Sequence, residues 1–379
     1  MWRLTVLVSL IVLIAGDLAA CSVPVFRYAL ERWVPDSYGV FVFHRGPLSD
    51  EEKSLVNRMD SNELPDSQFV NTSVTYIDLA QSVEPEALEL WEAQETETLP
   101  WIMVSFPWNL LAQDSNWAGP LTKASVDQVV DSPARREVAR RLLKGESAVW
   151  VFLESGDSAR DQQAEDRLKS RLEHLTAQLE LPLINPVDIE EGLISIDEDQ
   201  LKIEFSTIRL SRDDPAEAFF VRNLLVSEDD LMEFDEPIAF PIFGRGRVLY
   251  GLIGAGIAPD VIDEACVFLT GSCSCEVKEQ NPGMDLLMSV DWDRLVSTQF
   301  DIDRELPPLS GFVGLRADSP GIAAKVVSEE AAKDVSPESI LVDSEAEQRA
   351  DPFLFNTLLI CGIIGLGTLG AGAVVLWKR

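Results

Sequence analysis

The sequence predicts an α/β protein with two consecutive α/β domains. Two stretches of the chain show the same order of strand and helix signals, and 46% hydrophobic residues over 379 positions suffice for two buried cores. An apolar segment also stands near each end of the chain. We therefore divide the chain into a signal peptide (1–20), an N-terminal helix (21–35), domain 1 (36–146), domain 2 (147–292), an acidic proline-containing linker (293–351), a transmembrane helix (352–377) and a cytoplasmic end (378–379).

The overall charge excludes one class of partner. The chain carries 64 acidic and 31 basic residues, a net charge of -33, and such a surface repels the phosphates of nucleic acids. We expect no nucleic acid partner. Two histidines and five cysteines leave little material for a histidine-rich metal centre or for a disulfide-dense scaffold.

The N-terminal segment has the pattern of an export signal. Residues 4–16 are uncharged, too short to cross a bilayer comfortably and suited to the core of a signal peptide. The next residues, Leu18-Ala19-Ala20-Cys21, resemble the lipobox of bacterial lipoproteins, which implies that Cys21 is lipidated and held by membrane lipid. The alternative is cleavage after Ala20 that leaves Cys21 unmodified.

The residues after Cys21 predict a short amphipathic helix. Phe26, Leu30 and Trp33 share one helical face, which we expect to dock on domain 1. Pro24 gives the spacing Cys-x-x-Pro, but a redox cysteine needs a folded strand before it, and here the leader precedes it. Thiol chemistry at Cys21 is therefore not expected.

The C-terminal segment predicts a membrane anchor. Residues 352–377 carry no charge, exceed the ~20 residues that a spanning helix needs, and are followed by Lys378 and Arg379. Basic residues favour the cytoplasmic side, so the body lies outside a cytoplasmic membrane that the chain crosses once. Two small-x-x-x-small steps favour packing on a transmembrane partner, with a plain anchor as the alternative; they are Gly367/Ala371 and Thr368/Gly372.

Domain 1 is predicted from alternating strand and helix signals. Ser49 and Glu52 form a capping box that opens a helix toward Met59, and Ser132 with Pro133 opens another. The expected elements are strand 38–44, the helix after Ser49, strand 73–79, a short helix over 85–94, strand 99–107 and a basic helix from 132 to 146.

Domain 2 repeats this order. A capping box at Asp214 and Glu217, with Pro215 at the first helical position, predicts a helix start. The expected elements are strand 147–155, an amphipathic helix over 161–180, strand 201–210, that short helix, a hairpin over 236–254 around the turn 244–247, and a helix over 259–269.

This order of elements resembles the thioredoxin fold, most clearly over 237–269. The resemblance implies a cis peptide bond before Pro237 and an active site at the turn after the first strand of each domain. Those turns read "HRGPLS" and "SGDSARD" and contain no Cys-x-x-Cys. The resemblance therefore implies two tandem thioredoxin-like domains without thioredoxin chemistry, in which His44, Arg45 and Ser49 occupy the active-site position and are interpreted as structural.

The cysteines of domain 2 carry the most suggestive chemistry. Cys273 and Cys275 can offer two thiolates to a soft metal with Cys266 as a third, or Cys266 can bridge to one of them. A structural disulfide or buried thiols is the simpler interpretation, since no second metal-binding cluster is present. No cofactor is expected. Arg245 and Arg247 are interpreted as exposed turn residues, and Lys278 as a solvated charge.

These patterns favour a non-catalytic protein. We expect a membrane-anchored, extracytoplasmic binding or scaffold protein of the bacterial cell envelope, and not an enzyme. The alternative is an extracytoplasmic thiol-redox or metal-handling protein that uses Cys266, Cys273 and Cys275.

Overall fold

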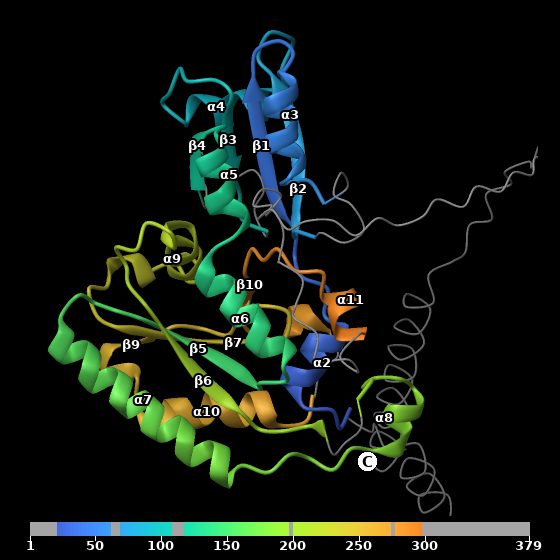
Figure 1. The fold of residues 1–379 in the computed structure, drawn as a ribbon, viewed down its shortest axis with the longest axis vertical. Coiled ribbons are helices and arrows are strands. Elements are labelled where there is room, and N and C mark those ends of the chain that lie inside the picture. The colour runs from blue at the N-terminus through green and yellow to red at the C-terminus, as the bar shows by residue number, and fades with distance from the viewer. Residues whose placement is uncertain (1–20, 62–68, 108–116, 197–199, 274–276, 298–379) are drawn as a thin grey trace, which may run out of the picture. The chain divides into compact units, whose positions relative to one another are not determined.

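Two β-sheets with flanking helices make up the described part of the chain (Figure 1). The computed structural model describes residues 21–61, 69–107, 117–196, 200–273 and 277–297. All of these lie in the first of two units of the chain, Met1–Leu315. The mixed sheets and helices confirm the predicted α/β class.

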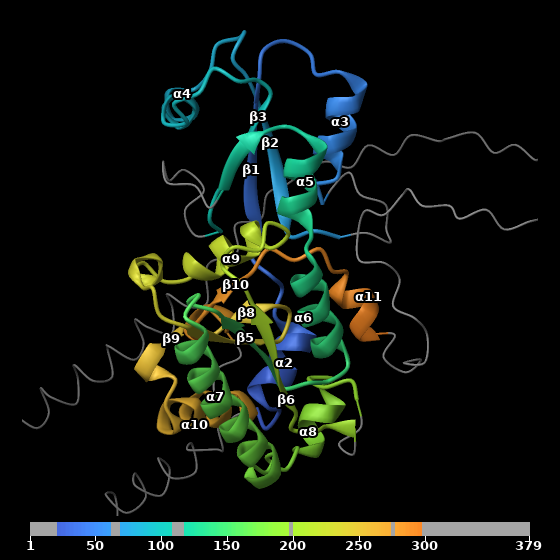
Figure 2. The ribbon, with the colours of Figure 1, turned by 60° about the vertical axis from the view of Figure 1, so that its left-hand side comes forward.

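The smaller sheet has the strand order β2-β1-β3-β4. β1 is parallel to β2 and antiparallel to β3, and β3 is antiparallel to β4. Helices cover both faces of this sheet, α3 and α5 on one and α4 on the other (Figure 2). Its elements are β1 (Tyr38–His44), α3 (Asp50–Asn57), β2 (Thr72–Asp78), α4 (Pro85–Glu92), β3 (Trp101–Val104), β4 (Trp117–Pro120) and α5 (Lys123–Val130).

The larger sheet has the order β10-β8-β7-β5-β6, with β9 paired to β7. β5 is parallel to β6 and antiparallel to β7, and β8 is antiparallel to β7. Its elements are α2 (Val25–Arg32), α6 (Pro133–Leu143), β5 (Ala148–Leu153), α7 (Ser158–Gln178), α8 (Pro186–Glu190), β6 (Phe205–Leu210), α9 (Ala218–Leu225), β7 (Ile238–Phe243), β8 (Arg247–Val248), β9 (Leu252–Ile253), α10 (Pro259–Thr270), β10 (Met284–Asp285) and α11 (Trp292–Ser297).

Side-chain alternation along β5 builds two cores. Trp150 and Phe152 point to the face covered by α7 and α10, whereas Val149 and Val151 point to the face covered by α6 and α9. All four side chains are fully buried. A strand buried on both faces is continuously apolar, which is why the run of residues 148–153 predicted it.

The N-terminal helix docks on the larger sheet, so the expectation that it docks on domain 1 is wrong. Phe26 and Trp33 of α2 enter the core between the larger sheet and α7 and α10, and Leu30 enters the core on the α6 side. The apolar face was identified correctly. The sheet that it covers depends on contacts with α10 and β7, which lie more than 200 positions later in the chain.

The chain enters the smaller sheet after α2 and returns to the larger sheet at α6. Ala134, Val138 and Leu142 of α6 pack against β5 and β6. α6 precedes the boundary between 146 and 147 that separates the two predicted domains, and that boundary stays a prediction.

Local start signals were mostly correct. Ser49 forms the expected capping box with Glu52, and Ser132 caps α6 with Pro133 in the first turn. The box at Asp214 was wrong, since Asp214 accepts from the Ala216 amide in a turn and α9 begins at Ala218. Glu217 instead accepts a hydrogen bond from the Ala134 amide of α6, at 2.7 Å.

The expected cis bond before Pro237 is also wrong. Among the described residues the cis peptide bond joins Leu99 and Pro100, directly before β3 of the smaller sheet. Pro237 precedes β7 in ordinary extended backbone, and its carbonyl accepts the Gly254 amide at 2.8 Å, beside the pairing of β7 with β9.

Candidate functional site

Three of the cysteines lie in one buried core. Cys21 is 4% exposed, Cys266 is fully buried and Cys273 is 1% exposed, and all belong to the core between the larger sheet, α7 and α10. An antiparallel bridge between Pro24 and Ser272 holds the N-terminal segment beside the end of α10. The sequence presented Cys21 and the later cysteines as separate features, and the structure brings them together. Cys275 and Cys361 lie outside the described residues.

The environment of Cys266 disfavours thiol chemistry. Burial in α10 raises the pKa of its thiol, and the nearby Asp263 carboxylate acts in the same direction. A thiol that stays protonated is a poor nucleophile and a poor metal ligand. Within the described residues, no three His, Cys, Asp or Glu side chains are grouped so that they could hold a metal ion.

Residues next to Cys21 are held by polar contacts. The Ser22 amide donates to the Asp188 carboxylate at 2.7 Å, and the Asn185 amide donates to Ser22 Oγ at 2.6 Å. The Ser22 hydroxyl also donates to Asp188. α8 therefore holds the start of the described chain. Lipidation of Cys21 stays a prediction.

At the turn after β1, the Asp78 side chain accepts a hydrogen bond from the backbone. Asp78 accepts from the amides of Gly46 and Ala80, both at 2.9 Å, and these contacts together with the Gln81 side chain lower the pKa of Asp78 to about 2. His44 Nδ1 lies 2.7 Å from the Gly46 carbonyl, and Ser49 caps α3. Arg45 is exposed in the bend after β1. His44 and Ser49 thus have local structural partners.

The turn after β5 is arranged in the same way. Asp161, which is 2% exposed, accepts from the amides of Ser155 and Gly156 at 2.8 and 3.2 Å. Asp157 accepts from the first amides of α7. An incoming anion or thiolate would bind such amides at a helix N-terminus. At α7 the Asp157 carboxylate already does so, and at α3 the Ser49 hydroxyl accepts from the Glu52 amide while the Glu52 carboxylate accepts from the Ser49 amide.

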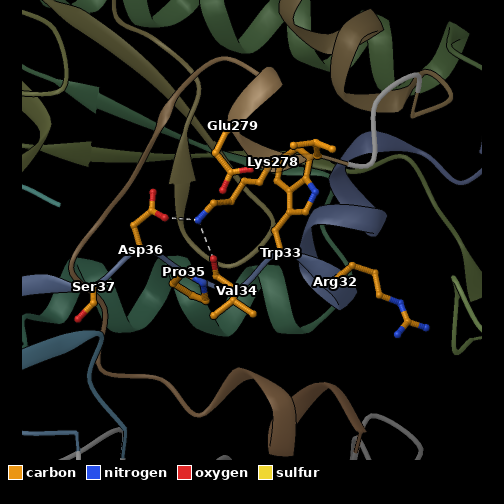
Figure 3. Close-up of a pocket in the computed structure, with 9 residues that line it drawn as sticks. Arg32, Trp33, Val34, Pro35, Asp36, Ser37, Lys278 and Glu279 are labelled. Atoms are coloured by element: carbon orange, nitrogen blue, oxygen red, sulfur yellow. Dashed lines mark hydrogen bonds and ion pairs between the residues drawn. The ribbon is translucent and has the colours of Figure 1, made fainter. Parts of the chain in front are cut away.

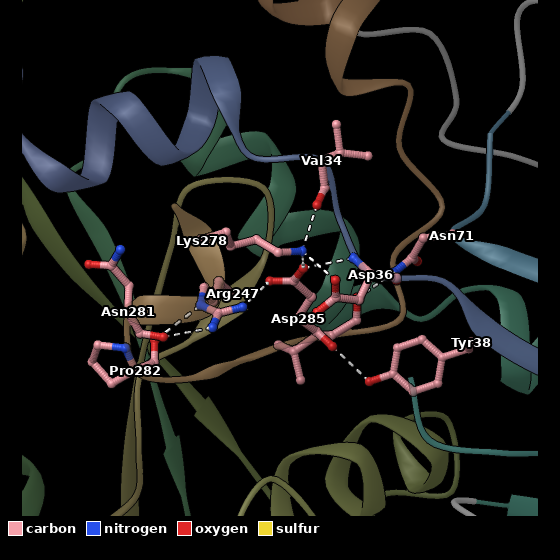
Figure 4. Close-up of polar contacts among 10 residues, drawn as sticks. Val34, Asp36, Tyr38, Asn71, Arg247, Lys278, Asn281, Pro282 and Asp285 are labelled. Atoms are coloured by element: carbon pink, nitrogen blue, oxygen red, sulfur yellow. Dashed lines mark hydrogen bonds and ion pairs between the residues drawn. The ribbon is translucent and has the colours of Figure 1, made fainter. Parts of the chain in front are cut away.

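A buried polar cluster of Lys278, Arg247 and Asp285 was missed in the sequence (Figures 3 and 4). Lys278 Nζ donates to Asp36 at 2.5 Å, to Asp285 at 2.8 Å and to the Val34 carbonyl at 2.7 Å. Arg247 donates to the other oxygen of Asp285 at 2.9 Å. Lys278, Arg247 and Asp285 are all less than a tenth exposed.

This cluster corrects two interpretations. Lys278 is a buried ion-pair partner, not a solvated charge, because Asp36 and Asp285 compensate its charge. Arg245 and Arg247 are 7% and 6% exposed, not displayed on the turn. Arg245 donates to the carbonyls of Leu30 and Glu31 at the end of α2, and Arg247 lies over the Trp33 ring. No sequence pattern pairs these distant positions.

A cavity of about 480 Å³ adjoins the cluster. Residues 32–37 line one side and residues 277–279 line the other (Figure 3). Lys278 faces Asp36 across it, and these two charged groups bind each other. Arg32 and Glu279 are the other charged residues that line this cavity.

Side chains from both sheets bind the extended segment after Lys278. Tyr38 donates to the Asp285 carbonyl at 2.8 Å and accepts from Asn223 at 2.9 Å (Figure 4). Asn71 donates to the Leu286 carbonyl at 3.0 Å and accepts from the Met288 amide at 2.7 Å. Arg135 donates to the Leu287 carbonyl at 3.1 Å. These contacts give the segment a structural role.

No protein-family model and no curated protein matches the chain. Among the described residues, no helix is long and apolar enough to cross a membrane. The predicted anchor 352–377, with Gly367, Thr368, Ala371 and Gly372, lies outside the described residues. The fold and the polar contacts above are therefore the basis for a functional proposal.

Proposed function

We propose that the chain is a non-catalytic, membrane-anchored binding or scaffold protein that works outside the cytoplasmic membrane. Its body consists of two α/β modules of thioredoxin-like topology. The leader 1–20 and the apolar segment 352–377 address the body to the membrane. Packing of the C-terminal helix on a transmembrane partner is part of the proposal.

The strand orders support the thioredoxin-like assignment. In each sheet the first strand is parallel to the second and antiparallel to the third, and the fourth pairs with the other side of the third. In the larger sheet β10 lies beyond this fourth strand. The module orders are β2-β1-β3-β4 and β6-β5-β7-β8. Along the chain, each module also has the strand-helix-strand-helix-hairpin-helix order on which the resemblance to thioredoxin-like proteins rests.

One observation carries the non-catalytic proposal. The turn after the first strand of each module has no thiol, and a carboxylate of the chain accepts from its backbone: Asp78 binds the Gly46 amide in one module, and Asp161 binds the Ser155 and Gly156 amides in the other. The position that would serve catalysis therefore holds an internal carboxylate. The alternative function, thiol-redox or metal handling, would instead need a reactive thiol among Cys266, Cys273 and Cys275.

Crosslinking of the full chain in native membranes tests the proposal. A photoreactive residue at exposed positions of the body, such as Ser54 or Val267, should trap a specific partner. The matched control is the same residue at a buried position, such as Val56. Failure to trap a partner from any exposed position contradicts the binding function. Stoichiometric metal or a reactive thiol in the purified chain would favour the alternative.

A further inference from the structure

Among the described residues, β2 forms one edge of the smaller sheet. β2 is an edge strand of seven residues, and within the described residues it pairs with β1 alone. Edge strands are usually protected by Pro, by Lys or by being short. The opposite edge follows this rule, since β4 has four residues and ends in Pro120, whereas β2 contains neither Pro nor Lys.

The direction of the main chain can be derived from two bonds. The Asn71 carbonyl accepts from the Tyr38 amide, and the Leu79 amide donates to the His44 carbonyl, so the odd-numbered positions between them, 73 to 77, direct their amides and carbonyls toward β1. In a strand the next residue points the opposite way. Val74 therefore directs its N–H and C=O toward the outer edge, where an added strand would bind.

A groove lies beside this edge. It measures about 450 Å³ and lies between β2 and α3. Leu48 and the Tyr76 ring, which is 46% exposed, give it apolar walls, and His44 also lines it. Lys53 and Asn57 face it from successive turns of α3. A groove between an edge strand and a helix accommodates the alternate side chains of an added strand.

The charges favour a cationic partner. Asp50 and Glu51, in the first turn of α3, are exposed. Lys53 lies 3.6 Å from Asp50, so these two charges offset each other, and Asp60 is the acidic residue that lines the groove itself. The whole chain carries a net charge of -33. Oppositely charged segments associate faster and like-charged segments are repelled.

We propose that the outer edge of β2 and the groove beside α3 bind an extended, cationic segment of a partner protein as an added strand. An apolar side chain of that segment occupies the groove between Leu48 and Tyr76. This inference rests on the proposed binding function and names the surface and the kind of partner.

Two synthetic peptides test this surface. One reads Lys-Lys-Thr-Val-Thr-Phe-Thr-Val-Lys-Lys, and the other has Glu in place of every Lys. Fluorescence anisotropy with the full chain in detergent should show binding of the cationic peptide alone. A cationic peptide that is methylated at alternate backbone nitrogens cannot donate hydrogen bonds from one edge. When the methylated edge is the one that pairs with β2, the peptide should no longer bind.

Variants of the chain separate the edge from the groove. V74P removes one outward N–H, which an edge strand tolerates, and should weaken binding about tenfold, the loss expected for one or two hydrogen bonds. N57W fills the groove and should have a similar effect. S54W, at an exposed position of the same helix, is the matched control and should bind like the wild type. Circular dichroism verifies that each variant is folded.

The outcomes are distinct. Equal binding by wild type and folded V74P, equal binding of the acidic peptide, or no binding of the cationic peptide would overturn the inference. If V74P leaves the crosslinked membrane partner unchanged, the binding function stands and the β2 surface is wrong. If no partner is trapped by the wild type, the binding function itself fails.

Discussion

Lys278 and Asp285 form a buried ion pair of 2.8 Å between residues seven positions apart in the chain. Asp36, from the segment that leads into the smaller sheet, binds the same amine, and its amide donates to the same carboxylate at 2.7 Å. The cluster thus joins the entrance of the smaller sheet to the edge strand of the larger one. Because Lys278, Arg247 and Asp285 are buried, each of these three charges depends on the others.

Removal of either partner should destabilise the fold. K278M leaves Asp285 with Arg247 as its remaining cation and should lower the free energy of unfolding by about 2 to 3 kcal/mol. D285N removes the carboxylate that Arg247 binds and leaves Lys278 with Asp36 as its remaining carboxylate, and it should cost about 3 to 5 kcal/mol. Urea unfolding measures both. The control K53M removes an exposed pair and should change stability by less than about 0.5 kcal/mol; equal losses in K53M and K278M would contradict this account.

Tyr38 should make the protein sensitive to alkaline pH. Burial raises the pKa of its phenol above the ordinary value of 10.0, so the folded state keeps a proton that the unfolded state loses. This contribution to stability is fully present below the ordinary pKa and is lost as the pH rises beyond it. Unfolding in urea between about pH 8 and 11 should show a steeper loss for the wild type than for Y38F. Parallel pH profiles would refute the assignment.

Y38F should also cost stability at neutral pH. The phenol donates to the Asp285 carbonyl and accepts from Asn223, so its removal leaves a buried carbonyl and a buried amide N–H without those partners. We expect a loss of about 1 to 3 kcal/mol at pH 7. The loss at neutral pH is the same at every pH, so wild type and Y38F are compared by how steeply the free energy of unfolding falls with pH.

Cys266 should be inert in the folded protein. Burial raises the pKa of its thiol, so the reactive thiolate is scarce at neutral pH. Native mass spectrometry after iodoacetamide treatment should find Cys266 unmodified, and the same treatment in guanidinium should alkylate it. V267C places a thiol at the neighbouring position, where the side chain is 53% exposed, and should react in the native state. Rapid native alkylation of Cys266 would instead support the thiol-redox alternative.

Gly244 should be required for docking of α2. Its φ is +57°, and an added Cβ would lie 2.7 Å from Ala29 Cβ. G244A should therefore cost about 2 to 4 kcal/mol from backbone strain and overpacking together. Gly46 is the matched control, because its φ is +76° and no atom lies within 4 Å of an added Cβ. G46A therefore reports the backbone strain without overpacking and should cost about 1 kcal/mol. Thermal unfolding measures both, and equal losses would show that the contact with Ala29 adds nothing.

The sequence by itself determined the elements whose signals are local. Ser49 and Glu52 set the start of α3 because a capping box joins residues three positions apart. The apolar run of β5 and the period of Leu168, Leu172 and Leu175 in α7 likewise act within one element. These elements together predicted the α/β class. The sequence also shows directly that neither turn contains Cys-x-x-Cys.

Only the tertiary structure decided which distant residues meet. Cys21 lies in the core that holds Cys266 and Cys273 because residues 23–25 pair with residues 271–273. Lys278 and Arg247 are buried because Asp36 and Asp285 compensate their charges, and Asp78 and Asp161 occupy the turns because the strands and helices bring them there. Burial and ion pairing depend on separation in space, whereas a sequence pattern reports only separation along the chain.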